Sequence, residues 1–262
     1  MPTSPWHKLL DSPEESHIVQ FYGADEELLI SHVAQFLSEG LKRGEGGTVI
    51  ATPEHLRAFM NRLNVGLRGR IEWLNPAEAL AGFMSGGMPD WDRFQRTIVP
   101  ALQRARRKSE RVRAYDEMVG ILWKLGQTHA AVRLEQFWNR LLSRSSFHLF
   151  CGHSIDIFGG QFHPHNVDAL LCAHTHVLPG ATGELERALS RAIEEVAGPK
   201  ADAMEAGMKS GRFWPRWGIL PPPEGLILWL RRQFPDQADE IVRRAREYCA
   251  ESLEEAVGAR YS

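Results

Sequence analysis

The 262-residue sequence has no long hydrophobic run. No stretch approaches the roughly 18 apolar residues that a membrane-spanning helix needs. The first residues, MPTSPWHKLLDSPEES, contain no apolar segment of the kind found in secretory signals. Cysteine is scarce as well, because Cys151, Cys172 and Cys249 are the only three, so we expect no framework of disulfide bonds. These absences predict a cytoplasmic protein with reduced thiols and no membrane contact.

Two common catalytic motifs are also missing. The sequence contains no Gly-Lys pair and therefore no P-loop, and its glycine-rich run GLKRGEGGT at 40–48 precedes a predicted strand instead of joining a strand to a helix. It contains no G-x-S-x-G nucleophile motif either. We therefore expect neither conventional ATP hydrolysis nor the chemistry of an α/β-hydrolase, and we interpret the chain as a non-enzymatic protein.

The sequence has no excess of charge of one sign. Its 31 basic and 33 acidic residues give a net charge of −2, which provides no field that would hold nucleic acid or an anionic membrane. Hydrophobic residues make up 43% and charged residues 24%, as in soluble globular proteins. We expect a folded protein that does not bind nucleic acid.

Short apolar runs alternate with longer amphipathic ones from residue 16 onward. The predicted strands cover residues 17–22, 48–52, 71–75, 112–118 and 147–153, with a sixth within 170–178. Helical patterns fill most of the intervals, as at 25–41 and 130–143. This order predicts an α/β fold with three layers, in which helices cover both faces of a mainly parallel central sheet.

The strand signal stops near residue 180. Helical patterns follow at 183–197, 201–208, 224–234 and 237–256. We therefore divide the chain into an N-terminal segment (1–15), an α/β domain (16–180) and a helical C-terminal region (181–262). Five apolar residues at helical spacing in this region either pack within the chain or form the seam of a homodimer, and the sequence leaves that choice open: Leu226, Leu230, Ile241, Ala245 and Tyr248.

Several strings in the α/β domain, taken together and in order, resemble the MEDS sensory domain, which is named from methanogens, methylotrophs and a dichloromethane-responsive regulator. They include HIVQFYGADEELL (17–29), RVRAYDEMVGILWKLGQTHAAVRLEQFWNRL (111–141), FHLFCGHSIDIF (147–158) and LCAHTHVLP (171–179). The resemblance covers residues 16–180. It implies a fold similar to the RecA or KaiC ATPase core and a role as a prokaryotic signal-input module that senses small hydrocarbon derivatives.

The same resemblance implies partners. Relatives of this kind are often joined to a histidine kinase or a DNA-binding regulator, whereas this chain shows neither kinase motifs nor a helix-turn-helix. We expect a small-molecule ligand and a partner kinase or transcription regulator reached through the C-terminal helices. Two departures from the usual pattern add polar groups: Asp116 stands where the family has Gly, and Cys151-Gly152-His153 stands where it has Cys-Ala-Tyr.

Residues at or just after the carboxyl ends of the predicted strands form the candidate ligand site, because ligands of open α/β sheets bind beyond these ends. The set comprises Thr52, Glu54, His55, Asp116, Glu117, Met118 and His153, together with Tyr22 from the first strand and Trp123 as part of an apolar wall. We favour Glu117, since a carboxylate at a strand end can bind a ligand or a cation. The alternative for Glu117 is an ion pair with Arg113 or Arg133.

A second cluster contains sulfur and imidazole donors. Cys151 and His153, with Cys172, His174 and His176, have spacings that would place each set on one face of a strand. Such donors suit zinc or another transition metal, although the spacing matches no standard zinc motif. The alternative is that these are buried or capping residues, and for His17 we favour a buried hydrogen bond over a ligand role.

Three functions follow from these observations. The first is a non-enzymatic sensor in which ligand binding changes how the C-terminal helices engage a signalling partner. The second is a metal-dependent or nucleotide-dependent enzyme that uses Asp116 and Glu117. The third is a scaffold that binds a partner without any ligand.

Overall fold

The structure is a computed structural model that describes residues 5–11, 16–106, 109, 111–181, 184–209 and 219–261. The chain forms two compact units. The first comprises Met1–Ser154 and Cys172–Leu178, and the second comprises Ile155–Leu171 and Pro179–Ser262. The region that we predicted to be helical, 181–262, therefore lies in the second unit, which also takes residues 155–171 from within the predicted α/β domain.

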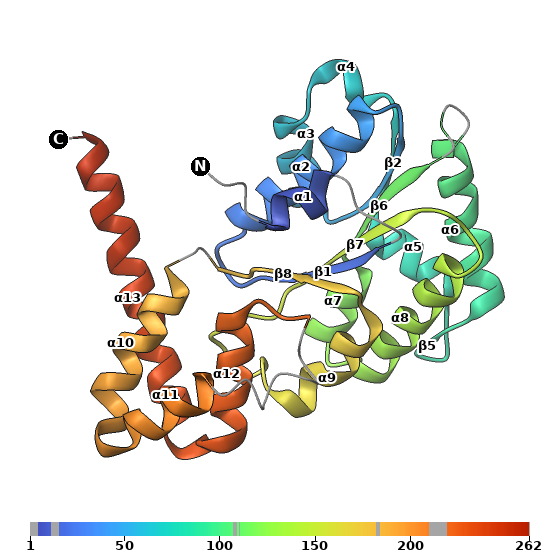
Figure 1. Ribbon diagram of the computed structural model, residues 1–262. Helices are drawn as coiled ribbons and strands as arrows, with labels where there is room; N and C mark the ends of the chain where they lie inside the picture. The colour runs from blue at the N-terminus through green and yellow to red at the C-terminus, as the bar shows by residue number, and fades with distance from the viewer. Residues whose placement is uncertain are drawn as a thin grey trace. The chain divides into compact units, whose positions relative to one another are not determined.

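The first unit contains a parallel sheet of six strands (Figure 1). In sheet order the strands are β3 (Ile71–Leu74), β2 (Gly46–Ile50), β6 (Val112–Asp116), β7 (His148–His153), β1 (His17–Phe21) and β8 (His176–Leu178). Every neighbouring pair is parallel, which confirms the predicted α/β fold with its parallel sheet. The sixth predicted strand is shorter than expected, because α9 (Pro164–Ala173) occupies the first residues of 170–178.

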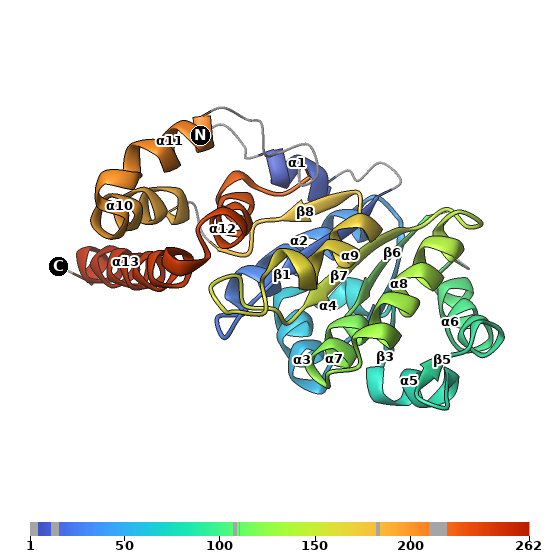
Figure 2. The same ribbon diagram turned by 90° about the horizontal axis from the view of Figure 1, so that it is seen from below.

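Helices lie on both faces of this sheet, so the predicted three-layer arrangement is confirmed (Figures 1 and 2). One layer contains α1 (Pro5–Asp11), α2 (Glu27–Lys42) and α3 (Pro53–Arg62), and the other contains α6 (Trp91–Arg106), α7 (Met118–Lys124) and α8 (Thr128–Leu142). The short helices α4 (Val65–Arg68) and α5 (Pro76–Phe83) and the hairpin of β4 (Met84–Ser85) and β5 (Met88–Pro89) complete the unit. Sequence patterns did not predict α1, α4, α7 or the hairpin.

Alternation along the strands decides which side chains face which layer. Ile18, Tyr115 and Phe150 belong to the core beneath α1, α2 and α3, where Phe36 and Phe59 pack edge-on against Phe150 and Tyr115. The residues next to them in the strands, His17, Asp116 and Cys151, therefore point to the opposite layer, toward α7 and α8. This parity brings the side chains of His17, Asp116 and Cys151 to the same face of the sheet, where they are buried.

Arg113 fixes α1 to the sheet. Its buried guanidinium donates to the Glu45 carboxylate at 2.5 Å and to the backbone carbonyls of Leu10 and Phe36 at 2.6 and 2.7 Å. Burial lowers the pKa of Arg113, and the hydrogen bond to Glu45 opposes this effect. The suggested ion pair between Arg113 and Glu117 is therefore wrong, because the Arg113 guanidinium forms its ion pair with the Glu45 carboxylate.

The second unit is helical, as predicted. Its helices are α10 (Leu185–Ala197), a 3-10 turn at Gly198–Lys200, α11 (Ala201–Lys209), α12 (Pro222–Gln233) and α13 (Pro235–Tyr261), and α10 packs along α13. The five apolar residues predicted for an internal core or a dimer seam are all buried within the chain. The buried Arg231 of α12 donates to the carbonyls of Phe158 and Gly159, which ties the 155–163 segment to this unit.

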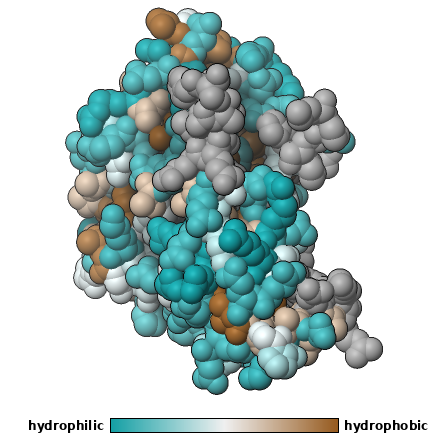
Figure 3. All heavy atoms as spheres, turned by 90° about the vertical axis from the view of Figure 1, so that its left-hand side faces the viewer, coloured by the Kyte–Doolittle hydropathy of each residue, from teal (hydrophilic) through white to brown (hydrophobic). Residues whose placement is uncertain are grey.

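Among the described residues, the exposed large apolar side chains are Val65, Met88 and Leu125. Figure 3 shows a face that is mostly hydrophilic, with hydrophobic residues in small separated patches. Within the described ranges, no helix combines the length and the apolar composition needed to cross a membrane.

Candidate functional site

Glu117 lies where the carboxyl ends of β2 and β6 meet. The strand β6 ends at Asp116 and α7 begins at Met118, so Glu117 occupies the turn between them. Its backbone N–H donates to the Ile50 carbonyl at 3.1 Å, and its side chain accepts the backbone N–H of Thr52 at 2.9 Å. These two bonds hold the carboxylate at the end of β2, where the crevice of an open α/β sheet is expected.

His55 and Tyr115 complete the contacts of this carboxylate. Thr52 caps the N-terminus of α3 by accepting the backbone N–H of His55, which places the imidazole beside β6. Nδ1 of His55 pairs with Oε1 of Glu117, and the hydroxyl of Tyr115 donates to the same oxygen at 3.0 Å. The other ring nitrogen, Nε2, lies 3.0 Å from Oε2 of Glu26. We call Glu26, Thr52, His55, Tyr115 and Glu117 the Glu117 group.

The electrostatics of the Glu117 group favour a charged imidazole. Burial acts to lower the pKa of His55, but the hydrogen bond and charge of Glu117, together with those of Glu26, outweigh it and raise the pKa above its usual value. Burial also raises the pKa of Tyr22, whose ring meets that of His55 edge-on at 5.8 Å. The group thus combines an imidazole whose protonated form is favoured with two glutamate side chains, beside a phenol that remains a hydrogen-bond donor.

The structure brings together only part of the predicted ligand set. Thr52, His55, Glu117 and Tyr22 meet at the Glu117 group, whereas Glu54 is exposed and pairs with Arg57 at 3.0 Å. Met118 and Trp123 are buried on α7, and the hydrogen bonds around Glu117 in the described chain include neither side chain. Asp116 and His153 lie on the opposite face of the sheet.

Asp116 is buried against α8. Its carboxylate accepts Nε1–H of Trp138 at 2.9 Å and the backbone N–H of Met118 at 3.1 Å. Burial raises the pKa of Asp116 to about 8, and the nearby carboxylates of Glu135 and Glu117 add to the effect. The Asp116 carboxyl therefore interacts electrostatically with both the Glu117 group and a second polar group around Glu135.

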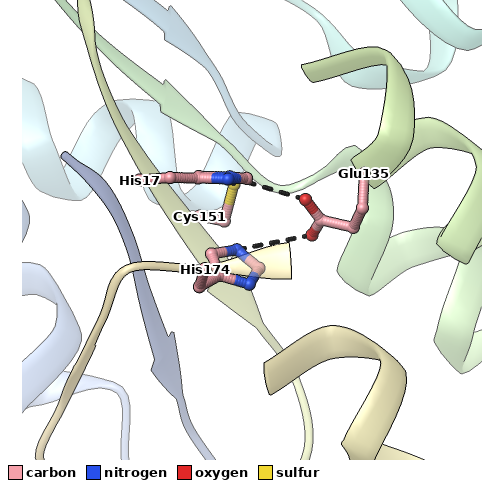
Figure 4. A group of neighbouring side chains, drawn as sticks. All are labelled: His17, Glu135, Cys151 and His174. Atoms are coloured by element: carbon pink, nitrogen blue, oxygen red, sulfur yellow. Dashed lines mark hydrogen bonds and ion pairs between the residues drawn. The ribbon is translucent and has the colours of Figure 1, made fainter. Parts of the chain in front are cut away.

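The second group is formed by β1, β7, α8 and the segment before β8. In Figure 4 the imidazoles of His17 and His174 and the thiol of Cys151 converge on the carboxylate of Glu135. Nε2 of His17 lies 3.3 Å from Sγ of Cys151 and 3.5 Å from Oε2 of Glu135, while Nε2 of His174 lies 3.5 Å from Oε1. His153 approaches the same Oε1 at 3.1 Å. We call these five buried residues the Glu135 group.

The protonation of His17 can be read from its other ring nitrogen. Nδ1 lies 3.0 Å from the backbone carbonyl of Ala173 and 3.0 Å from Oδ1 of Asn139. A carbonyl only accepts, so Nδ1 carries a hydrogen, and Nε2 is the ring nitrogen that faces Cys151 and Glu135. Burial lowers the pKa of His17 and raises the pKa of the Cys151 thiol well above its usual value, so both are neutral near pH 7.

Comparison with protein families decides what kind of domain this is. The family model described as the methanogen/methylotroph, DcmR sensory domain (MEDS) matches residues 16–175, which is more than half of the chain. The chain belongs to the MEDS family. Membership of this sensory family indicates a signal-sensing role. Searches of curated proteins and of solved structures gave no significant match.

Asp116, Gly152 and His153, the residues at which we expect departures from the family pattern, lie in or beside the two polar groups. Asp116 holds the indole of Trp138, and His153 contacts Glu135. Gly152 lies against the hydroxyl of Tyr115, where an added Cβ would overlap that oxygen. The glycine therefore leaves the space that lets Tyr115 reach Glu117.

The predicted metal ligands of the MEDS domain are also only partly assembled. Cys151, His153 and His174 lie in the Glu135 group, whereas Cys172 is exposed on α9 and His176 is half-buried at the start of β8. The expectation that Cys172, His174 and His176 share one strand face is wrong, because α9 runs to Ala173.

Sequence reasoning missed Glu135 and assigned His17 to a buried hydrogen bond, which it does make. A usable signal existed for Glu135. It occupies the buried stripe of α8, four residues after Ala131 and three before Trp138, where an apolar residue is expected.

Proposed function

We propose that this MEDS domain is a non-enzymatic sensor that binds a small ligand at the Glu117 group and passes its occupancy to a partner histidine kinase or transcription regulator. The observation that carries the proposal is the buried Glu117 carboxylate at the carboxyl end of β6, joined to residues from β2 and α3. Ligands of parallel α/β sheets bind at this edge.

The chemistry of the group favours a ligand with one polar head and a short apolar body. Carboxylates from Glu26 and Glu117 outnumber the single imidazole of His55, so a hydroxyl or an amine is favoured over an anionic head. Aromatic rings stand beside these polar atoms, since Phe59 stacks on His55 at 5.5 Å and packs edge-on against Tyr115 at 5.1 Å. Short alcohols and amines match this combination.

Glu26 provides the route to the site. Its side chain is 44% exposed, whereas His55 and Glu117 are buried, so Glu26 is the member of the group that can turn into solvent without leaving a buried charge behind. A ligand head that replaces the Glu26 carboxylate on Nε2 of His55 would reach the buried part of the group. Glu26 immediately precedes α2, so its displacement would change the conformation at the N-terminus of that helix.

Ligand binding can regulate a partner only if it favours one conformation of the chain over another. We place the output in the helices α10, α12 and α13, because the chain carries neither a kinase motif nor a helix-turn-helix. In this proposal the ligand is released chemically unchanged, as expected of a sensor.

The test is a thermal-shift and calorimetric screen of the full chain with alcohols and amines of one to four carbons, and with the matching carboxylic acids. We expect an alcohol or an amine to bind and to be recovered unchanged by mass spectrometry. Hydrogen exchange in α10, α12 and α13 should change when that compound is added. Turnover of the compound would refute the sensor and favour an enzyme.

Matched variants identify the site. Glu117→Gln should abolish binding while circular dichroism shows a folded chain, because the amide no longer balances the charge of His55. Glu54→Gln removes the same charge from an exposed position on α3 and should bind as the native chain does. Binding that survives Glu117→Gln, or that is lost equally in Glu54→Gln, would remove the Glu117 group from the proposal.

A further inference from the structure

The Glu135 group is the second assembly of buried polar side chains in the first unit, and the proposed ligand site does not use it. Four ligand atoms, from His17, Glu135, Cys151 and His174, lie within 4.8 Å of one another, and all four residues are buried. They come from three strands or strand connections and one helix, so the fold itself brings them together.

Glu135 brings a buried carboxylate into this group. The carboxylate is almost wholly buried on α8, and apart from the imidazoles no hydrogen-bond donor in the described part of the chain reaches either of its oxygens. A buried carboxylate requires a compensating positive charge. The nearest polar atoms are the imidazole nitrogens of His17, His153 and His174, at 3.1 to 3.5 Å, and a cation bound among them would supply that charge.

Three of the separations are close to those of a tetrahedral metal site. Bond lengths of roughly 2.0 Å to nitrogen or oxygen and roughly 2.3 Å to sulfur place neighbouring ligand atoms roughly 3.3–3.7 Å apart in a tetrahedron. Nε2 of His17 lies 3.3 Å from Sγ of Cys151 and 3.5 Å from Oε2 of Glu135, and Nε2 of His174 lies 3.5 Å from Oε1 of Glu135. The four ligand atoms as a set lie within 4.8 Å of one another. A cation at the centre would need only small inward movements of these side chains.

The residues around the group support the same interpretation. Metal-bound histidines usually donate their second nitrogen to a carbonyl or carboxylate oxygen, which fixes the tautomer. His17 does so through Ala173 and Asn139, and Asn139 also donates its Nδ2–H to the Ala173 carbonyl at 2.9 Å. His153 then contacts the carboxylate of Glu135 from outside the set of four.

We propose that His17, Glu135, Cys151 and His174 bind one divalent transition metal ion of the zinc class. One thiolate, two imidazoles and one carboxylate are the mixed soft and intermediate donors that such ions select over magnesium or calcium. Binding displaces the proton of the Cys151 thiol to solvent, so one proton is released for each ion bound.

Metal binding would also fix a particular segment of the chain. His174 lies in Cys172–Leu178, a short part of the first unit that is flanked in sequence on both sides by residues of the second unit. An ion that joins His174 to β1, β7 and α8 would stabilise this segment against local opening. The site is separate from the Glu117 group, so the metal proposal does not depend on the proposed ligand.

The experiment begins with elemental analysis of the full chain purified without added metal or chelator. Chelated, metal-free protein is then titrated with Co²⁺, which reports tetrahedral geometry through visible bands and a bound thiolate through a charge-transfer band. We expect one equivalent of Co²⁺ with a thiolate band, displacement by Zn²⁺, and a higher unfolding temperature with Zn²⁺. The native chain showing no thiolate band would overturn the proposal.

Variants locate the ion. Cys151→Ser should remove the charge-transfer band, and Cys172→Ser, which changes an exposed cysteine on α9, should keep it. Asn139→Ala removes a hydrogen bond behind His17 and should weaken Co²⁺ binding by roughly 10-fold to 100-fold. A band lost in Cys172→Ser instead of Cys151→Ser, or unchanged affinity in Glu135→Gln, would contradict this assignment even if a metal is bound.

Discussion

Replacing Glu224 by glutamine should remove most of the loss of α12 stability that the native chain shows between about pH 5 and pH 8. Glu224 lies in the first turn of α12 and is buried, and one of its oxygens accepts the backbone N–H of Gly180 at 2.8 Å. Burial raises the pKa of Glu224 to about 7, and the hydrogen bond from Gly180 only partly offsets this effect. The native chain therefore holds this side chain as a neutral acid at pH 5.

The sign of the effect follows from proton binding. Glu224 binds its proton more tightly in the folded chain, with a pKa of about 7, than in the unfolded chain, where the usual value is 4.5. The free energy of unfolding therefore falls as pH rises from about 4.5 to about 7 and is constant above that range. At roughly 1.4 kcal/mol per pKa unit the whole loss is about 3 kcal/mol, of which about 2 to 3 kcal/mol falls between pH 5 and pH 8.

This loss can be measured by hydrogen exchange of the α12 amides at pH 5 and pH 8, after correction for the intrinsic exchange rates. The native chain should lose about 2 to 3 kcal/mol of protection at pH 8, and Glu224→Gln should lose much less, because glutamine keeps the acceptor for Gly180 and does not ionise. Glu186→Gln, an exposed change on α10, is the control and should behave as the native chain does. Equal pH dependence in Glu224→Gln and the native chain would refute the reasoning.

Two further predictions concern the first unit. Arg113→Met should lower the free energy of unfolding by about 3 to 5 kcal/mol in urea titrations, because it leaves the Glu45 carboxylate and two backbone carbonyls without their buried donor. Glu45→Gln should lower it less. A loss below about 1 kcal/mol in Arg113→Met would contradict the role of Arg113 in holding α1 against the sheet. Gly152→Ala should displace the Tyr115 hydroxyl from Glu117 and destabilise the unit by about 1 to 3 kcal/mol. An unchanged unfolding midpoint in Gly152→Ala would show that Tyr115 has room to move.

The sequence was sufficient to predict the sheet because each strand is a short apolar run between helical patterns. Residues 17–21 and 148–153 are buried throughout, as expected for strands covered on both faces. The segment 170–178 was harder to interpret, because the end of α9, its connection and β8 together occupy only nine residues. A single apolar pattern covered both a helix end and a strand.

The candidate sites were predicted unevenly, for a physical reason. Glu117, His55 and Thr52 follow strands whose carboxyl ends lie at one edge of the sheet, so local sequence was enough to bring them together. Glu135 and His17 are 118 residues apart in the sequence and meet only because α8 packs over β1. Contacts of that kind depend on the order of the strands and on helix packing, which no local pattern records.

The strand β6 places consecutive side chains on opposite faces of the sheet. Tyr115 faces α3 and holds Glu117, whereas Asp116 faces α8 and holds Trp138. An insertion or deletion of one residue within β6 would exchange these faces and dismantle both polar contacts in a single step. Point substitutions can alter the two faces independently, but the length of this strand cannot vary, so we expect MEDS domains that keep both groups to keep the spacing between Arg113 and Glu117 unchanged.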